Sequence, residues 1–148
     1  MASPNRGLEN SLRITRFFQA TREKVFEAWT RPEQMSRWCA PSDEYSTIAE
    51  VDLRIGGRYR IEMTHASGSV HTAVGEYREV APPERLVYTW SWEDGAVKDS
   101  LVTVELRELD GGAELTLVHE QFADAEQSAK HEQGWTGCFN RLEAALAG

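Results

Sequence analysis

The sequence predicts an α+β fold in which a curved antiparallel β-sheet wraps around one long C-terminal helix. Three observations lead to this prediction. An initial strand is followed by two short helical segments, six segments of alternating apolar residues fill the middle, and an apolar stripe at helical spacing ends the chain. Because short turns join the alternating segments, we expect them to pair into one antiparallel sheet with one solvated face. The predicted order is therefore β-α-α-β6-α.

The first third of the chain predicts the initial strand and the two helices. The alternation over residues 12–18 is typical of a strand. Thr21 can cap the following helix, whose apolar residues recur at helical spacing, namely Val25, Phe26 and Trp29. Pro32 suits the first turn of a second short helix over residues 33–38.

Six further strands are predicted between turn signals such as Gly56-Gly57, Asp94-Gly95 and Asp110-Gly111-Gly112. Side chains alternate across a strand, so every second residue shares a face. This parity assumes that no β-bulge interrupts a strand, because an extra residue inverts the faces beyond it. The predicted inward set is Thr47, Ala49, Val51, Leu53, Tyr59, Ile61, Met63, Ala73, Gly75, Tyr77, Leu86, Tyr88, Trp90, Trp92, Val102, Val104, Leu106, Leu115, Leu117 and His119.

The C-terminal segment predicts the long helix that covers the sheet. Asp124, with Gln127 three residues later, resembles a capping box, and Ser128 is a competing start. Gly134 and Gly137 lack side chains, and we expect them to let the helix approach the sheet closely. The apolar residues lie four, three and four positions apart, in a single stripe made of Trp135, Phe139, Leu142 and Leu146.

Length and composition suit one domain over residues 11–148, preceded by a flexible leader over residues 1–10. The net charge of −8, without a cluster of Lys or Arg, argues against binding to nucleic acid or an anionic membrane. Neither a signal peptide nor a membrane-spanning run is present, so we expect a cytoplasmic protein. Cys39 and Cys138 lack the spacing of a disulfide framework or zinc site, and we predict neither a metal nor a cofactor.

Seven blocks of residues carry a family resemblance. They are Phe26-Glu27-Ala28-Trp29-Thr30-Arg31-Pro32-Glu33, Arg37-Trp38, Val51-Asp52-Leu53-Arg54-Ile55-Gly56-Gly57-Arg58-Tyr59, Gly75-Glu76-Tyr77-Arg78-Glu79-Val80, Pro82-Pro83-Glu84-Arg85-Leu86, Leu115 to Glu120, and His131-Glu132-Gln133-Gly134-Trp135. In this order they resemble the activator of heat shock protein 90 ATPase homologue-like family of the START/SRPBCC superfamily. The resemblance extends from about Ile14 to Leu146. It implies the helix-grip fold of START and birch-pollen-allergen-like proteins.

The resemblance also implies a cavity between sheet and helix, in which superfamily members bind lipids, polyketides, hormones or drugs. Aromatic side chains with polar tips are typical of small-molecule sites, although they can equally fill a core. We expect Trp38 near the cavity mouth, and we expect Leu117→Trp or Gly75→Trp to block the cavity while keeping the fold. The predicted ligand-binding residues are Trp38, Tyr59, Met63, Gly75, Tyr77, Tyr88, Trp90, Leu117, His119, Trp135 and Phe139.

His119 is the main candidate for proton transfer, because strand parity places it inward and histidine titrates near neutral pH; a tyrosine is the alternative. A histidine bonded to a backbone carbonyl is the structural alternative. His65 and His71 flank a turn and are expected to be exposed, and no histidine has metal-ligand spacing. Cys39 could be a reactive thiol at the mouth, although an inert, half-buried cysteine is the plainer interpretation.

Three functions follow from these observations. The leading hypothesis is binding of a small hydrophobic or aromatic molecule in the cavity. An enzyme that acts on a polyketide- or lipid-like substrate is the alternative, although inward pairs of carboxylates are lacking. A domain that interacts with the heat shock protein 90 chaperone is the third, but 148 residues leave no space for the additional domain of the co-chaperone. The family also suggests a homodimer, formed through an exposed Trp38 or a sheet edge.

Overall fold

The computed structural model describes residues 10–147, so the predicted leader lies outside the described residues except for Asn10. The chain forms ten elements in these residues. They are β1 (Leu12–Phe18), α2 (Arg22–Thr30), α3 (Pro32–Trp38), β2 (Tyr45–Val51), β3 (Arg58–His65), β4 (Val70–Ala81), β5 (Arg85–Trp92), β6 (Ser100–Leu109), β7 (Gly112–Glu120) and α4 (Ala125–Ala147).

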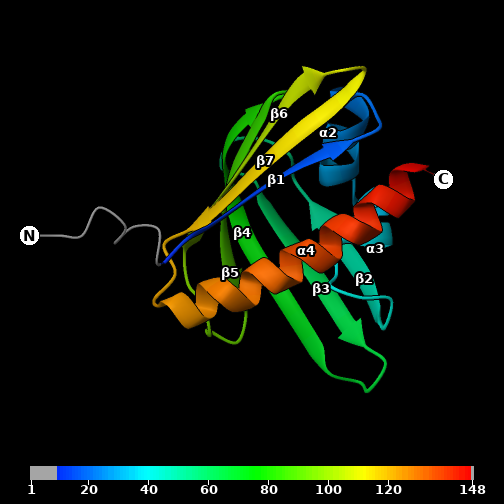
Figure 1. Cartoon of the computed structure of the whole chain (residues 1–148). Coiled ribbons are helices and arrows are strands. Elements are labelled where there is room, and N and C mark those ends of the chain that lie inside the picture. The colour runs from blue at the N-terminus through cyan, green and yellow to red at the C-terminus, as the bar shows by residue number, and fades with distance from the viewer. Residues whose placement is uncertain (1–9, 148) are drawn as a thin grey trace, which may run out of the picture.

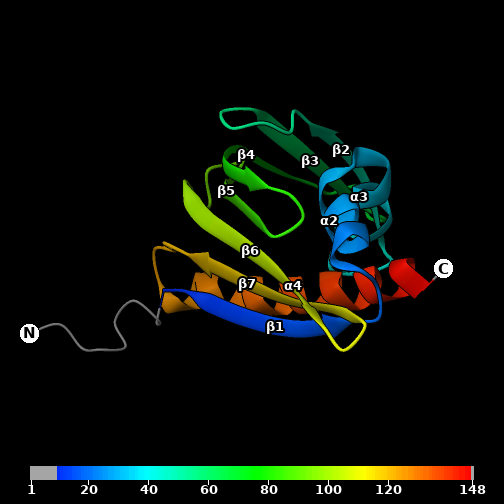
Figure 2. The same ribbon diagram turned by 90° about the horizontal axis from the view of Figure 1, so that it is seen from above.

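The seven strands form one sheet in the order β1-β7-β6-β5-β4-β3-β2, and every neighbouring pair is antiparallel. The sheet curls around α4, which lies along its concave side, while α2 and α3 sit at one end (Figures 1 and 2). Asp110 and Gly111 both have positive φ angles, which matches the tight hairpin turn between β6 and β7. The predicted β-α-α-β6-α order and helix-grip fold are therefore confirmed.

Strand parity is interrupted at two places. A register shift between Tyr77 and Glu79 in β4 marks a bulge. Before the bulge the odd-numbered residues of β4 face the core, and beyond it the even-numbered Val80 packs on the core. Leu53 was predicted to face inward, but β2 ends at Val51 and Leu53 is exposed in the following loop. Parity did not reveal the end of β2, because the alternation of the sequence runs on into the loop.

The helix α4 begins as the Asp124 capping box predicts. The backbone N–H of Gln127 donates to the Asp124 carboxylate over 2.9 Å, and the helix starts at Ala125, so Ser128 is not its first residue. Gly137 permits a close approach, but to the loop after α3: a Cβ at this position would lie 2.2 Å from the carbonyl oxygen of Pro41. Gly134, in contrast, has no atom within 4 Å of its would-be Cβ. The predicted approach of both glycines to the sheet is therefore wrong.

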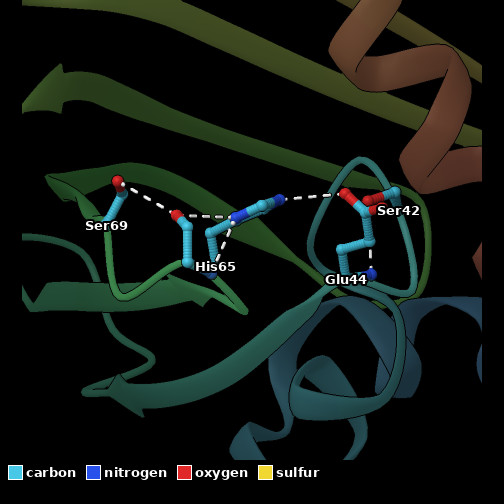
Figure 3. A network of polar contacts seen from close by, with 5 residues as sticks. Ser42, Glu44, His65 and Ser69 are labelled. Carbon is cyan, nitrogen blue, oxygen red and sulfur yellow. Dashed lines mark hydrogen bonds and ion pairs between the residues drawn. The ribbon is translucent and has the colours of Figure 1, made fainter.

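A polar network joins the α3–β2 loop to the β3–β4 turn. His65 Nε2 lies 2.9 Å from a Glu44 oxygen, and His65 Nδ1 lies 2.9 Å from the Ser67 hydroxyl, which in turn contacts Ser69 (Figure 3). His65 is therefore half-buried where exposure was expected, whereas His71 is exposed. Among residues 10–147, no helix is both long and apolar enough to cross a membrane.

Candidate functional site

The candidate site is an apolar pocket of about 230 Å³ between α4 and the middle of the sheet. Strands β3 and β5 form one wall, α4 forms the opposite wall, and the loop after α3 closes one end. The lining residues are Cys39, Pro41, Met63, Trp90, Trp92, Lys130, His131, Gly134, Trp135 and Cys138.

Gly134 lines the pocket on the α4 side. No atom lies within 4 Å of its would-be Cβ, so a side chain at this position would point into open space. Trp135, the next residue, and Cys138, about one turn further along the same helix, also line the pocket. The indole of Trp90 lies 5.4 Å from that of Trp135 and 5.3 Å from that of Trp92, measured between ring centroids. Three indoles therefore shape the pocket.

His119 lies behind this wall, fully buried, with both ring nitrogens engaged. The Trp135 indole N–H donates to Nδ1 over 3.0 Å, and Nε2 lies 2.8 Å from the Ser100 hydroxyl. Ser100 in turn donates to the carbonyl oxygen of Trp90 over 2.5 Å. Since Nδ1 accepts, the neutral ring carries its proton on Nε2 and donates it to Ser100.

Electrostatics agree with a neutral His119. Burial, together with the neighbouring His131, lowers its pKa to about 2. At neutral pH the lone pair of Nδ1 is therefore occupied by the Trp135 N–H, and the single N–H of the ring, on Nε2, is donated to Ser100. Neither nitrogen is free to exchange a proton with a substrate. These contacts describe a structural histidine that fixes Trp135 and Trp90, and they resemble the carbonyl-bonded alternative, with Ser100 placed between.

His131 is bonded in the same manner at the edge of the pocket. Its Nδ1 lies 2.7 Å from the backbone oxygen of Gln127, and its Nε2 accepts from the Trp92 indole over 2.9 Å. Burial lowers the pKa of His131. Two tryptophan–histidine pairs, Trp135–His119 and Trp92–His131, therefore hold the indoles in place while presenting uncharged surfaces.

The two thiols are buried in the pocket wall. Burial raises the pKa of Cys39 well above its ordinary value and raises that of Cys138 to about 12. Cys39 is only 4% exposed, so it is neither half-buried nor located in an open mouth. Both side chains are consequently neutral, weakly polar groups at neutral pH.

Comparisons with known proteins agree with this architecture. The family model described as "Activator of Hsp90 ATPase homolog 1-like protein" matches residues 19–147. The chain belongs to this family. A comparison with curated proteins gave no match.

Several solved structures are similar to this chain over nearly its whole length. Protein CV1439 from Chromobacterium violaceum is 31% identical, with a TM-score of 0.83 over 94% of this chain and 98% of that chain. The AHSA1 protein SPO3351 from Silicibacter pomeroyi is 29% identical, with a TM-score of 0.80 over 93% and 97% of the two chains. An AHSA1-like protein from Aeromonas hydrophila is 26% identical, with a TM-score of 0.75 over 91% and 93%.

Within this family member, the predicted ligand-binding residues divide between the pocket and the packed interior. Met63, Trp90 and Trp135 line the pocket. Tyr59, Tyr77 and Tyr88 instead surround an inner void of only about 10 Å³, together with Trp90 and Trp135. Trp38 also borders this inner void. The other predicted residues line neither space and are Gly75, Leu117, His119 and Phe139.

Three of these placements correct the sequence analysis. Trp38 is 1% exposed and donates its indole N–H to the Ala28 carbonyl, so it lies in the core and is not available for a dimer contact. A Cβ at Gly75 would lie 2.0 Å from the Thr89 carbonyl oxygen, so Gly75→Trp would disrupt the sheet. Leu117 is fully buried away from the pocket, and a tryptophan there would overpack the core.

Sequence reasoning missed the α4 side of the pocket at Lys130, His131, Gly134 and Cys138. A signal was present: residues 131, 135, 138 and 142 repeat the four-three-four spacing of the predicted stripe, displaced toward the N-terminus. The polar character of His131 concealed this stripe. Trp92 was placed on the inner face but was not included in the site.

Proposed function

We propose that the pocket between α4 and the sheet binds a small, uncharged, largely aromatic or apolar molecule. The observation that carries this proposal is the 230 Å³ space bounded by three indoles and opened by the missing side chain of Gly134. This volume is below the roughly 300–1,000 Å³ of sites for drug-sized molecules, so it suits a small ligand of about ten non-hydrogen atoms. Small-molecule sites commonly combine such apolar walls with few polar groups.

The charge state of the lining supports an uncharged ligand. The thiols of Cys39 and Cys138 are neutral because burial raises their pKa values, and burial also keeps His131 neutral by lowering its pKa. Lys130, the one cation of the lining, is exposed and pairs with Glu126 over 3.3 Å. A buried ionic group of the ligand would lack a partner of opposite charge, which carries a large cost in free energy.

Membership in the START/SRPBCC superfamily is consistent with this proposal, since the fold is known for ligand-binding cavities. The apolar wall gives the driving force, because removing apolar surface from water contributes about 25 cal/mol per Å². Flat rings also stack on indoles, which favours aromatic over aliphatic ligands of the same size.

Titration with tetralin, a bicyclic hydrocarbon of ten carbons, tests the proposal. Saturable quenching or enhancement of tryptophan fluorescence is expected, since the pocket contains Trp90, Trp92 and Trp135. Gly134→Leu fills the space and should abolish the response, whereas Gly134→Ala, the matched control, should retain most of it. A saturable response that survives Gly134→Leu would place the binding site elsewhere.

Native mass spectrometry identifies the natural occupant. The protein is purified from its own host without denaturation, and any molecule bound to it is extracted. We expect an uncharged apolar molecule with the wild-type protein and none with Gly134→Leu. A mass that co-purifies equally with both proteins would contradict binding in this pocket.

A further inference from the structure

The five tryptophans differ in one respect, which is the partner of the indole N–H. Four of the five donate a hydrogen bond, whereas Trp90 Nε1 is buried and has no partner among the described residues. Trp90 is only 5% exposed. The four bonded pairs are Trp29 to the Tyr88 hydroxyl at 3.1 Å, Trp38 to the Ala28 carbonyl at 2.8 Å, Trp92 to His131 at 2.9 Å and Trp135 to His119 at 3.0 Å.

An unpartnered buried donor destabilises a fold, and native proteins rarely retain one without a reason. A phenylalanine at position 90 would fill much of the same volume without leaving a donor unpaired. The N–H groups of the neighbouring indoles are both paired, because Trp92 donates to His131 and Trp135 donates to His119. An acceptor from outside the chain would satisfy this unpaired N–H.

The position of Trp90 indicates where that acceptor enters. Trp90, Trp135 and Cys39 form a wall common to the pocket and the inner void. The inner void of about 10 Å³ is at the lower limit for a single water molecule. Because Trp90 Nε1 is itself buried, an acceptor in the pocket requires the side chains around this wall to move apart before it can reach the N–H. Met63 and Met35, which line the pocket and the void respectively, have the flexible side chains that such a movement requires.

We propose that the ligand carries an uncharged hydrogen-bond acceptor that accepts from Trp90 Nε1, and that the ligand belongs to the class of flat aromatic carbonyl compounds. This inference rests on the proposed function, because it concerns the same pocket. The ring system stacks among the indoles of Trp90, Trp92 and Trp135, and the carbonyl oxygen extends toward the inner void. A carbonyl oxygen is the simplest uncharged acceptor, and it suits a pocket whose buried thiols and histidine are neutral.

A matched pair of probes tests the inference. Tetralin and 1-tetralone share a bicyclic skeleton and differ by one carbonyl oxygen. We expect the wild-type protein to bind 1-tetralone about tenfold more tightly than tetralin, because the carbonyl satisfies a donor that is otherwise unpaired. In Trp90→Phe this preference should disappear. In the control variant Trp92→Phe it should persist, because the N–H removed there donates to His131 in the wild-type protein.

Nuclear magnetic resonance of the wild-type protein gives a second readout that needs no variant to fold. The Trp90 indole N–H resonance should move downfield with 1-tetralone and much less with tetralin, while that of Trp38, bonded to Ala28, should stay in place. Equal affinities for the two probes, or a Trp90 resonance unmoved by the ketone, would overturn the inference while leaving the proposed function intact. Failure of both probes to bind would overturn the proposed function and this inference together.

Discussion

The space between the sheet and α4 is filled at one end and open at the other. At the filled end, Phe139 of α4 packs edge-on against Phe18 of β1. Leu142 of α4 and Leu115 and Leu117 of β7 belong to the same core, and all five side chains are at most 1% exposed. At the open end, Gly134 faces β3 and β5 across the pocket of about 230 Å³. The same helix and the same sheet therefore form a packed core and a cavity side by side.

The two ends differ in the side chains that α4 presents to the sheet. Where α4 presents phenylalanine or leucine, the space is occupied, and where it presents Gly134, a pocket lined by the buried side chains of Met63 and Trp90 remains. Hydrogen bonds then keep the open end from collapsing, because the two histidines hold the indoles of Trp92 and Trp135 in position. Interiors without such support normally close to a dense packing.

Truncation of the filled end should have the largest effect. Leu117→Ala removes a fully buried side chain, and we expect a loss of about 4 kcal/mol in the free energy of unfolding. Met63→Ala, at the open end, should cost about 2 kcal/mol, since part of the methionine already borders empty space. Urea denaturation measures both. Equal losses would mean that the two ends are packed alike.

The glycine at the junction of α4 and the α3–β2 loop should be nearly as sensitive. A Cβ at Gly137 would lie 2.2 Å from the Pro41 oxygen, so Gly137→Ala forces backbone apart and should cost about 3 kcal/mol. The midpoint of urea denaturation should fall accordingly. An unchanged midpoint would indicate that the loop can move away from α4 at little cost.

The histidines of the open end should make stability depend on pH. The folded protein keeps His119 neutral down to a pKa of about 2, whereas in the unfolded chain the residue titrates near pH 6.5. Between these values only the unfolded chain binds the proton, so stability is complete above pH 6.5 and falls as the pH decreases. The slope for His119 is about 1.4 kcal/mol per pH unit, and His131, with its lowered pKa, adds in the same direction.

The variant His119→Phe isolates this contribution. It loses one titrating group, so the slope of unfolding free energy against pH between 6 and 4 should decrease by about 1.4 kcal/mol per pH unit. Its stability at pH 7 should also fall, because the Trp135 indole loses its acceptor. An unaltered slope would mean that His119 is protonated in the folded protein, contrary to its enclosed position.

The fold was predictable because it depends on periodicity and turn chemistry, which are local. Alternation identified the strands, and Asp124 identified the start of α4. The site was less predictable, since parity tells only which face a residue occupies. Tyr59 and Met63 share the inner face of β3, yet only Met63 lines the pocket. The bulge at Tyr77 and the contact of Gly137 with Pro41 arise from tertiary packing, which no spacing in the sequence reveals.

Gly134→Ala should have the smallest effect on stability, and it has the opposite sign. Alanine favours a helix by about 1 kcal/mol over glycine, and its Cβ here meets no atom within 4 Å. We therefore expect a gain of up to about 1 kcal/mol in the free energy of unfolding, measured by urea denaturation. A loss would mean that the added methyl group contacts the pocket wall. A gain would show that the methyl group fits and that glycine at this position makes the helix less stable than alanine would.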